Sequence, residues 1–565
     1  VWSMSRWNKD IEVGERCVLT LPLNCHPRDT RFLDQVFQIE NKLKNQLIEW
    51  YKTQLNEMTR TRLWREASQA LADLHTEYGP DMKLLAELDE KAKKKPLSKT
   101  KEAKRVQLRQ KAKEFQAKQK PLYETRNGMI RKYEFSRGDF EKRMAKYRRS
   151  YTDFVGSMVA QRLADDVWDM FQSYLYGKGK AIRFSGINKF LTIEGKNNSA
   201  NIVFDRKAMK VFIGQGRHKT GIRVKRSRKD PCGYEAEALS REICYCRITR
   251  KAYPEGWRYF LQLVLKGAPP VKAKPDTGEL LHPMGEGRVG MDIGPQTLAY
   301  CGEDVLDLVE LAPGAQNLQE EIRRINRAMD RSRRATNPGM FDKAGQIIPG
   351  NRLPRELLDS HGKRKWVKSK QYREMERHRR YLYRKQADLR KAKHQQLANK
   401  LLAAGDRFYV EDMSWRALSR RSKQARKNKK GKNLSKKRFG KSIANKSPGA
   451  FLSILEKKVL AQGGSFYRIN IWKARASQFH HMTGQYIKKK LSQRVDILED
   501  GSKVQRDLYS AFLIMHSNKA LDGFLVSSCN RDYPKFLQMH NKAMAALAAS
   551  DKPLPSSMGV RRKAA

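Results

Sequence analysis

The chain has 565 residues and carries 117 Lys and Arg against 60 Asp and Glu, which gives a formal net charge of +57. A charge of this size opposes compaction unless a polyanion neutralises it, so we expect nucleic acid as the main partner. A basic membrane protein fits poorly, because the sequence has neither a run of about 18 apolar residues nor an apolar signal segment at its start. We expect no membrane partner and a cytoplasmic location. The length allows about two to four domains.

The seven cysteines are scattered and none forms a CxxC pair. An odd, scattered set predicts reduced intracellular thiols. Neither a disulfide framework nor a four-cysteine zinc ribbon can be assembled from them.

The first half of the chain changes its hydrophobic period twice. Residues 11–23 alternate between apolar and polar and predict one strand. From 30 to 178 the apolar positions recur every three to four residues, which predicts helices. Between 181 and 267 the period is two again, and short segments such as 182–184 and 236–239 predict an antiparallel barrel that the early strand could join. The helices would then be an insertion between the first two strands of the barrel.

The segment from Lys91 to Lys120 is very rich in Lys and predicts a helical hairpin that touches a phosphate backbone. For any one Lys, an exposed helix face without a ligand is an alternative of similar weight.

A strand with an acid in its middle opens the second half. Val289, Met291 and Ile293 alternate with two glycines and Asp292, so Asp292 points away from the apolar face. An unpaired buried charge is costly, so a buried Asp292 needs a cation, a donor or water. On this strand alone, an Asp that faces solvent is an equally good interpretation.

Two later acids make metal binding the better interpretation of Asp292. Glu411 ends a predicted strand at 407–412, and Asp507 lies in the first turn of a predicted helix at 505–512. Three strands, a helix, a strand with the second acid, then helix, strand and helix bring such acids together in the RNase H-like fold. Clustered carboxylates need cations to ionise together, and their hard oxygens suit Mg²⁺ or Mn²⁺. Two such ions can activate water and stabilise the leaving oxygen of a phosphodiester, which is nuclease chemistry.

Long basic helices are predicted at about 314–335 and 365–404, between the first two acids. The most basic stretch of the chain follows at 420–441 and predicts a lid that orders on nucleic acid. A disordered solubilising loop is the alternative.

Three segments carry a family resemblance. Val-Gly-Met-Asp-Ile-Gly at 289–294, Tyr-Val-Glu-Asp-Met at 409–413 and Gln-Arg-Asp-Leu-Tyr-Ser-Ala-Phe at 505–512 resemble the three RuvC motifs of TnpB-type transposon nucleases and of the type V CRISPR effectors descended from them. The resemblance covers nearly the whole chain in order. It implies an enzyme that binds a guide RNA, recognises a short motif beside its double-stranded DNA target and cleaves DNA at one RuvC site. Asp292, Glu411 and Asp507 would be the catalytic residues and the ligands of two Mg²⁺ or Mn²⁺ ions.

The fold implied by the resemblance is a multidomain α+β architecture. A wedge-type antiparallel β-barrel with a helical recognition insertion would precede an RNase H-like (RuvC) α/β nuclease domain with inserted basic helices. The expected parts are a first barrel strand (1–29), the helical recognition domain (30–178), the rest of the barrel with a linker (179–286), RuvC part I (287–311), basic helices (312–404), RuvC part II (405–473) with a basic lid (415–448), a zinc-free target-strand-loading insertion (474–503), RuvC part III (504–549) and a disordered tail (550–565).

One departure from the family concerns zinc. The family commonly carries a four-cysteine zinc ribbon between the second and third motifs, yet no cysteine lies between Glu411 and Asp507. His480 and His481 stand there instead, but adjacent histidines cannot share a metal as an i, i+4 pair on a helix can. We therefore expect no zinc and a metal-free loop that contacts the substrate strand.

Several basic, polar and aromatic side chains are candidate nucleic-acid contacts, and ordinary phosphate or solvent contact is the alternative for each. They are Arg323, Arg324, Arg327, Trp415, Arg420, Arg421, Arg475, Gln478 and Arg494.

Two other functions remain open on the sequence. One is an RNA-guided DNA-binding protein that does not cleave, and the other is a guide-independent nuclease or recombinase on the same fold. A monomer is slightly preferred, and neither the guide nor the flanking motif can be read from the chain.

Overall fold

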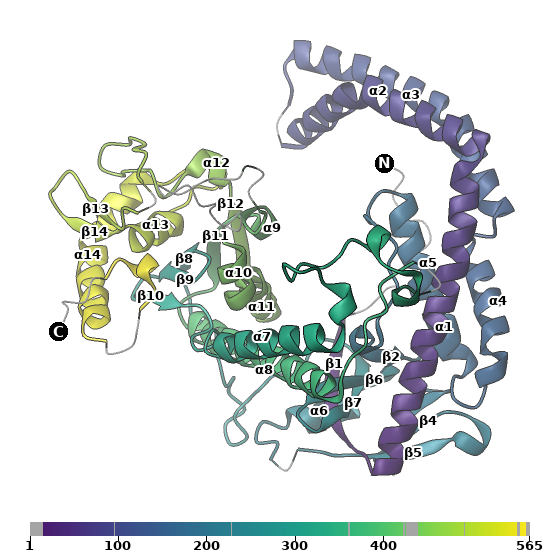
Figure 1. Cartoon of the computed structure of the whole chain (residues 1–565). Coiled ribbons are helices and arrows are strands. Elements are labelled where there is room, and N and C mark those ends of the chain that lie inside the picture. Colours follow the sequence, from purple (N-terminus) through teal and green to yellow (C-terminus); the bar gives the residue numbers. More distant parts are fainter. Residues whose placement is uncertain are drawn as a thin grey trace. The chain divides into compact units, whose positions relative to one another are not determined.

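The computed structural model describes residues 15–94, 96–227, 229–359, 362–421, 424, 439–490, 492–550 and 554–560. The chain divides into two compact units (Figure 1). The first comprises Val1–Asp230, Glu235–Lys251 and Arg258–Pro270, and the second comprises Pro231–Tyr234, Ala252–Trp257 and Val271–Ala565.

A seven-stranded antiparallel sheet forms the base of the first unit, in the order β2-β6-β7-β1-β5-β4-β3. Its first strand alternates buried and exposed residues, as the period-2 pattern predicts, and residues 11–14 of the predicted strand lie outside the described residues. The strands are β1 (Arg16–Asn24), β2 (Thr192–Glu194), β3 (Ile202–Asp205), β4 (Lys210–Ile213), β5 (Thr220–Val224), β6 (Ile243–Tyr253) and β7 (Gly256–Lys266).

The predicted barrel is a nearly closed sheet. Within the described residues no ladder joins the two edge strands, β2 and β3. The connection between them fills the gap, because the Asn198 side chain accepts hydrogen bonds from the Phe204 amide at 2.8 Å and from the Cys246 thiol at 3.1 Å. This sheet encloses its core without a complete ring of backbone pairing.

Two predicted strands of this region are wrong. Residues 182–184 form no strand, and residues 236–239 lie in a helix, α6 (Tyr234–Ser240). The Asp230 carboxylate accepts hydrogen bonds from the amides of Glu235 at 2.9 Å and Ala236 at 3.0 Å. This capping satisfies backbone amides that the start of a helix leaves unpaired, so the segment forms a helix rather than the predicted strand.

Five long helices follow β1 in the chain, as the helical period predicts. Tyr51 stacks on Phe140 at 3.5 Å between ring centroids, which ties the first helix of the block to a later one. The helices are α1 (Pro27–Arg60), α2 (Arg62–Lys94), α3 (Lys99–Lys132), α4 (Arg137–Arg148) and α5 (Ser157–Leu175).

Helices α2 and α3 form the predicted Lys-rich hairpin, which is longer than 91–120 because α2 already begins at Arg62 and α3 continues to Lys132 (Figure 1). Ion pairs cross it from Arg105 to Asp89 at 2.7 Å and from Lys111 to Asp81 at 2.7 Å. Some of its cations therefore hold the hairpin together. Contact with a phosphate backbone stays a prediction.

The second unit is built on a mixed sheet in the order β10-β9-β8-β11-β12. Strands β8, β11 and β12 are parallel, and β9 is antiparallel to both of its neighbours. The strands are β8 (Arg288–Ile293), β9 (Thr297–Cys301), β10 (Leu306–Glu310), β11 (Arg407–Glu411) and β12 (Ser465–Ile469), with a separate hairpin of β13 (Val495–Ile497) and β14 (Lys503–Gln505).

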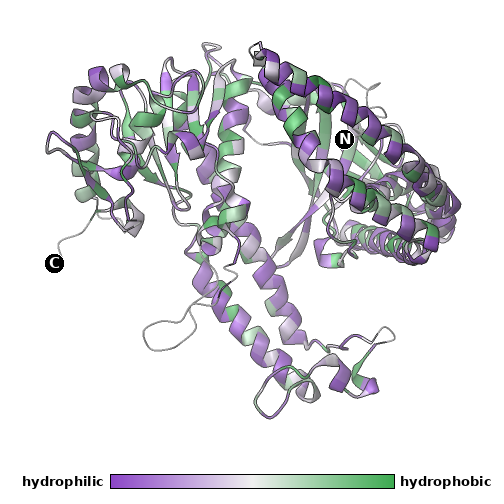
Figure 2. Ribbon diagram, turned by 90° about the horizontal axis from the view of Figure 1, so that it is seen from above, coloured by the Kyte–Doolittle hydropathy of each residue, from purple (hydrophilic) through white to green (hydrophobic). Residues whose placement is uncertain are grey.

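Helices cover both faces of the mixed sheet. The basic helices predicted at 314–335 and 365–404 are α7 (Leu318–Thr336) and α8 (Lys370–Leu402). Hydrophobic residues concentrate on the strands, whereas the long helices are largely hydrophilic (Figure 2). The remaining helices are α9 (Trp415–Leu418), α10 (Gly440–Lys446), α11 (Pro448–Ala461), α12 (Ile471–Ala474), α13 (Arg506–Met515) and α14 (Val526–Ala548).

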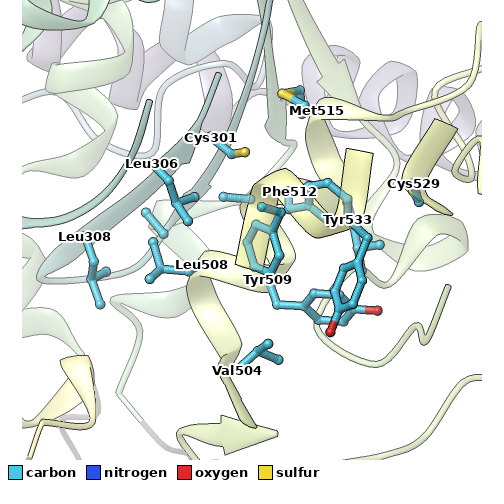
Figure 3. Close-up of a cluster of buried hydrophobic side chains, with 14 of the residues drawn as sticks. Cys301, Leu306, Leu308, Val504, Leu508, Tyr509, Phe512, Met515, Cys529 and Tyr533 are labelled. Atoms are coloured by element: carbon cyan, nitrogen blue, oxygen red, sulfur yellow. The ribbon is translucent and has the colours of Figure 1, made fainter. Parts of the chain in front are cut away.

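Each face of the sheet has its own core. Val289 and Met291 pack in one buried cluster with residues of α8 and α11, such as Phe451. On the opposite face Leu508 and Phe512 of α13 pack in a second cluster with β9, β10 and α14 (Figure 3). Because side chains of a strand alternate between faces, Asp292 points to the α13 side.

No helix in the described part of the chain is long and apolar enough to span a membrane.

A buried histidine makes the stability of this unit sensitive to acid. His394 is 1% exposed, and its Nε2 donates to the Lys446 carbonyl at 2.8 Å. Burial lowers its pKa to about 4. The unfolded chain, with an ordinary histidine pKa of about 6.5, then binds the proton more readily, so stability is lost as the pH falls from about 6.5 towards 4.

We expect His394→Gln, which keeps a donor for Lys446 but cannot titrate, to lose less stability on acidification than the wild type. The difference should grow to at most about 2 kcal/mol between pH 7 and pH 5. Denaturant melts of both proteins at the two pH values measure it, and parallel pH profiles would contradict the assignment.

Candidate active site

The strand register places Glu411 beside Asp292. Strands β8 and β11 are parallel, and Val410 is the partner of Met291. Glu411, the next residue of β11, therefore lies beside Asp292 of β8, and the backbones of the two residues are separated by the strand spacing of about 5 Å. Both acids lie at the carboxyl ends of their strands, where α/β proteins commonly bind ligands.

The third acid comes from α13, which crosses β8 in very close contact. A Cβ placed on Gly290 would lie 2.1 Å from the Ala511 carbonyl oxygen and 2.2 Å from the Met515 nitrogen. Only a glycine allows the helix backbone to approach the strand this closely. Gln505 caps the start of the helix, because its side chain accepts a hydrogen bond from the Leu508 amide at 2.7 Å. Asp507 lies two residues further on, in the first turn of the helix.

The three acids influence one another electrostatically. The pKa of Asp292 is held well above its ordinary value by burial, and the nearby charges of Asp507 and Glu411 raise it further. Burial also raises the pKa of Glu411 to about 7. Such carboxylates resist ionising together unless positive charge enters the site.

Arginines supply positive charge to Asp507. Arg506 Nη2 lies 3.1 Å from one oxygen of Asp507, and Arg494 Nη1 lies 3.9 Å from the other. Arg506 also donates to the Gln493 carbonyl at 3.1 Å, which fixes its guanidinium. Across the described ranges, no three His, Cys, Asp or Glu side chains are arranged as a ready metal-binding group.

The donor set nevertheless fits a hard divalent cation. All three acids offer oxygen ligands, two of them are buried enough to have raised pKa values, and hard oxygens suit Mg²⁺ and Mn²⁺. Ser510, one turn after Asp507, is 1% exposed, and its hydroxyl faces the Asp292 carboxyl, where hydrogen bonding lowers the pKa of that group against the larger effect of burial.

The histidines of the segment expected to replace a zinc ribbon are buried and structural. The His480 ring lies between Glu499, at 2.9 Å from Nδ1, and Asp496, at 3.2 Å from Nε2, and the Lys489 ammonium also contacts Asp496. His481 turns the other way and pairs with the Tyr509 hydroxyl at 2.7 Å. The contacts of His480 lie within the segment, and the His481–Tyr509 pair joins the segment to α13.

The candidate contact residues differ in exposure. Trp415 is half-buried beside the core, and a Cβ on Gly449 would lie 3.0 Å from its ring. The Arg475 guanidinium lies 4.1 Å from the centroid of the Tyr486 ring. Arg494 and Gln478 are half-buried, and the exposed candidates are Arg323, Arg324, Arg327, Arg420, Arg421 and Arg475. Of the predicted lid at 415–448, residues 422–423 and 425–438 lie outside the described residues.

Two residues of the site, Arg506 and Ser510, are not among those predicted from the sequence. A cation directly before a candidate catalytic acid was a usable signal for Arg506. A hydroxyl three positions after Asp507, within an otherwise apolar helix, was the signal for Ser510.

No protein-family model and no curated protein matches the chain. A solved structure described as the Cas12f1-sgRNA-target DNA complex is similar at 11% identity and a TM-score of 0.39, and the match covers 90% of this chain and 99% of that one. A second, described as a CRISPR-Cas12f ternary complex, shares 11% identity at a TM-score of 0.22, covering 90% of this chain and 100% of that one.

We expect Gly290→Ala to separate α13 from β8 and displace Asp507 from Asp292. The overpacking should cost about 1–3 kcal/mol of stability. Gly350→Ala is the matched control, because a Cβ on Gly350 meets nothing within 4 Å and its φ is not positive. Thermal melts of both variants test the contact, and equal midpoints would contradict it.

Proposed function

We propose that the second unit is a divalent-metal-dependent nuclease of the RuvC type that hydrolyses DNA phosphodiester bonds. The observation that carries the proposal is the meeting of Asp292, Glu411 and Asp507, which are distant in sequence, at one edge of one sheet. Stability alone gives no reason to place acids together, since the charges of Asp507 and Glu411 raise the cost of ionising Asp292. A site that must hold cations does give that reason.

In this proposal the three acids hold two Mg²⁺ or Mn²⁺ ions, which when bound activate water and stabilise the leaving oxygen. Asp507 would be one of the ligands of these ions, and Arg506, whose Nη2 lies 3.1 Å from Asp507, would bind the phosphate that carries the scissile bond. Arginine suits this role because its planar fork matches phosphate oxygens. The buried surroundings of Asp292 keep the charges of the site from being screened by water.

We further propose that the chain is guided by RNA. The formal charge of +57, the three motifs in order and the basic hairpin α2–α3 support a protein that holds nucleic acid along much of its length. Base pairing between guide RNA and target would then supply sequence specificity, while the protein holds the backbone and reads a short flanking motif. The alternatives are guided binding without cleavage and cleavage without a guide.

Asp292→Asn should lower the cleavage rate of target DNA by at least about 100-fold, because loss of a metal ligand removes several kcal/mol of transition-state stabilisation. Binding of guide and target should be retained in gel-shift measurements. Asp412→Asn is the control, since Asp412 is an exposed acid next to Glu411. Wild-type cleavage by Asp292→Asn would refute the site and favour a role in binding alone or a different catalytic centre.

Metal removal gives a second test. EDTA should abolish cleavage and added Mg²⁺ or Mn²⁺ should restore it, whereas a zinc-selective chelator should leave it unchanged. Loss of activity with the zinc chelator would contradict the zinc-free assignment of residues 474–503.

Purification tests the guided part separately. Protein expressed with its genomic neighbourhood should retain a discrete RNA species, and removing that RNA should abolish cleavage of a matched duplex. Cleavage that persists without RNA would instead support the guide-independent nuclease.

A further inference from the structure

A tryptophan beside the candidate active site is fully presented to solvent. Trp472 is 83% exposed, more than any other large hydrophobic side chain in the described part of the chain, the next being Ile497 at 62%. An indole is a large apolar body whose burial is favourable, so such exposure is costly and needs a reason.

The exposure of Trp472 does not come from a loose backbone. The Asn470 side chain accepts hydrogen bonds from the amides of Trp472 at 3.0 Å and Lys473 at 3.3 Å. The Asn470 amide donates to the Leu521 carbonyl at 2.8 Å, and the neighbouring Ala474 is 1% exposed. A capped and anchored turn therefore holds the indole outward.

The turn lies at the same edge of the sheet as the candidate catalytic acids. Strand β12 runs parallel to β11 with Ile469 as the partner of Glu411, and the Asp412 amide donates to the Ile469 carbonyl at 3.0 Å. Trp472 follows three residues later, in α12 directly after β12 (Figure 1). Strand spacing and rise per residue put its backbone on the order of 10 Å from Glu411.

The surroundings of Trp472 suit a polyanion. Residues 465–475 contain Arg468, Lys473 and Arg475 and no acidic residue. Lys473 pairs with Asp522 at 3.1 Å and is 65% exposed, so it can also reach solvent anions. A protein partner is not favoured by an isolated aromatic within a basic stretch, whereas a nucleic acid strand offers both phosphates and base faces.

We propose that Trp472 is a stacking platform for an unpaired base of the DNA strand entering the nuclease site. The inference rests on the proposed nuclease function and adds a residue that positions its substrate. Only a single-stranded segment can offer a free base face, because the bases of a duplex are stacked on one another. Base–aromatic stacking contributes about 1–3 kcal/mol per base and tolerates any sequence, as a nuclease without base preference requires.

Binding is measured first, in full-length protein with its bound RNA and in the Asp292→Asn background, where DNA stays intact. A single-stranded DNA oligonucleotide carrying 2-aminopurine is the probe. Trp472→Ala should weaken its affinity by about 5- to 100-fold and remove the quenching caused by stacking, while Trp472→Phe should retain most of both. Leu460→Ala, which truncates a 56% exposed apolar side chain on α11 outside the insertion at 474–503, is the matched control and should change neither.

Cleavage is measured second, with Asp292 intact. Trp472→Ala should raise KM for a single-stranded substrate and leave kcat within about twofold, because stacking is lost equally from ground and transition states. Unchanged affinity and quenching in Trp472→Ala would overturn the proposal, and so would a change in oligomeric mass, which would assign Trp472 to a contact between copies. The binding experiment does not need cleavage, so its failure is distinguishable from failure of the nuclease assignment.

Discussion

The contact between the backbone of α13 and strand β8 is the constraint on which the candidate site depends. Glu411 is placed by a ladder of hydrogen bonds, which fixes its position next to Asp292. Asp507 has no such ladder and reaches the site only because Gly290 lets the helix lie directly on the strand. The apolar side of α13 secures this contact, since Leu508 and Phe512 are fully buried against β9, β10 and α14 (Figure 3). Packing energy thus sets the geometry of charged groups.

The same packing creates an electrostatic cost at the site. Burial beside two other acids disfavours the ionised form of Asp292, and the arginines at Asp507 offset only part of this. A folded protein with this arrangement gives up stability that a site of neutral residues would keep. Functional sites commonly show this pattern, in which local electrostatics disagree with stability. The helices α8, α11 and α14 offset this loss of stability, because they form apolar cores on both faces of the sheet.

Local patterns predicted the elements better than the contacts between them. Alternation along β8 placed Asp292 on the face opposite Val289, and the helical period anticipated α1 to α5, α7 and α8. The strand predicted at 236–239 was wrong, because the helix cap by Asp230 outweighs a weak strand pattern. Arg506 and Ser510 left signals in the sequence, but their contacts and the contacts around His480 could not be predicted, since these depend on which segments meet in three dimensions. The exposure of Trp472 was also hidden, because an aromatic in an apolar stretch usually indicates a core position.

Because β8 pairs directly with β11, the distance between their two acids does not depend on the length of the chain that connects the strands. Helices α7 and α8 and the loops around them connect the two strands, but the ladder alone sets the spacing of Asp292 and Glu411. Loop-closure entropy grows slowly with length, so this connection can lengthen or shorten at small thermodynamic cost. The sheet can therefore accept new segments at this point while the three acids keep their positions. Diversification by insertion, with a constant arrangement of acids at the sheet edge, is open to such a protein.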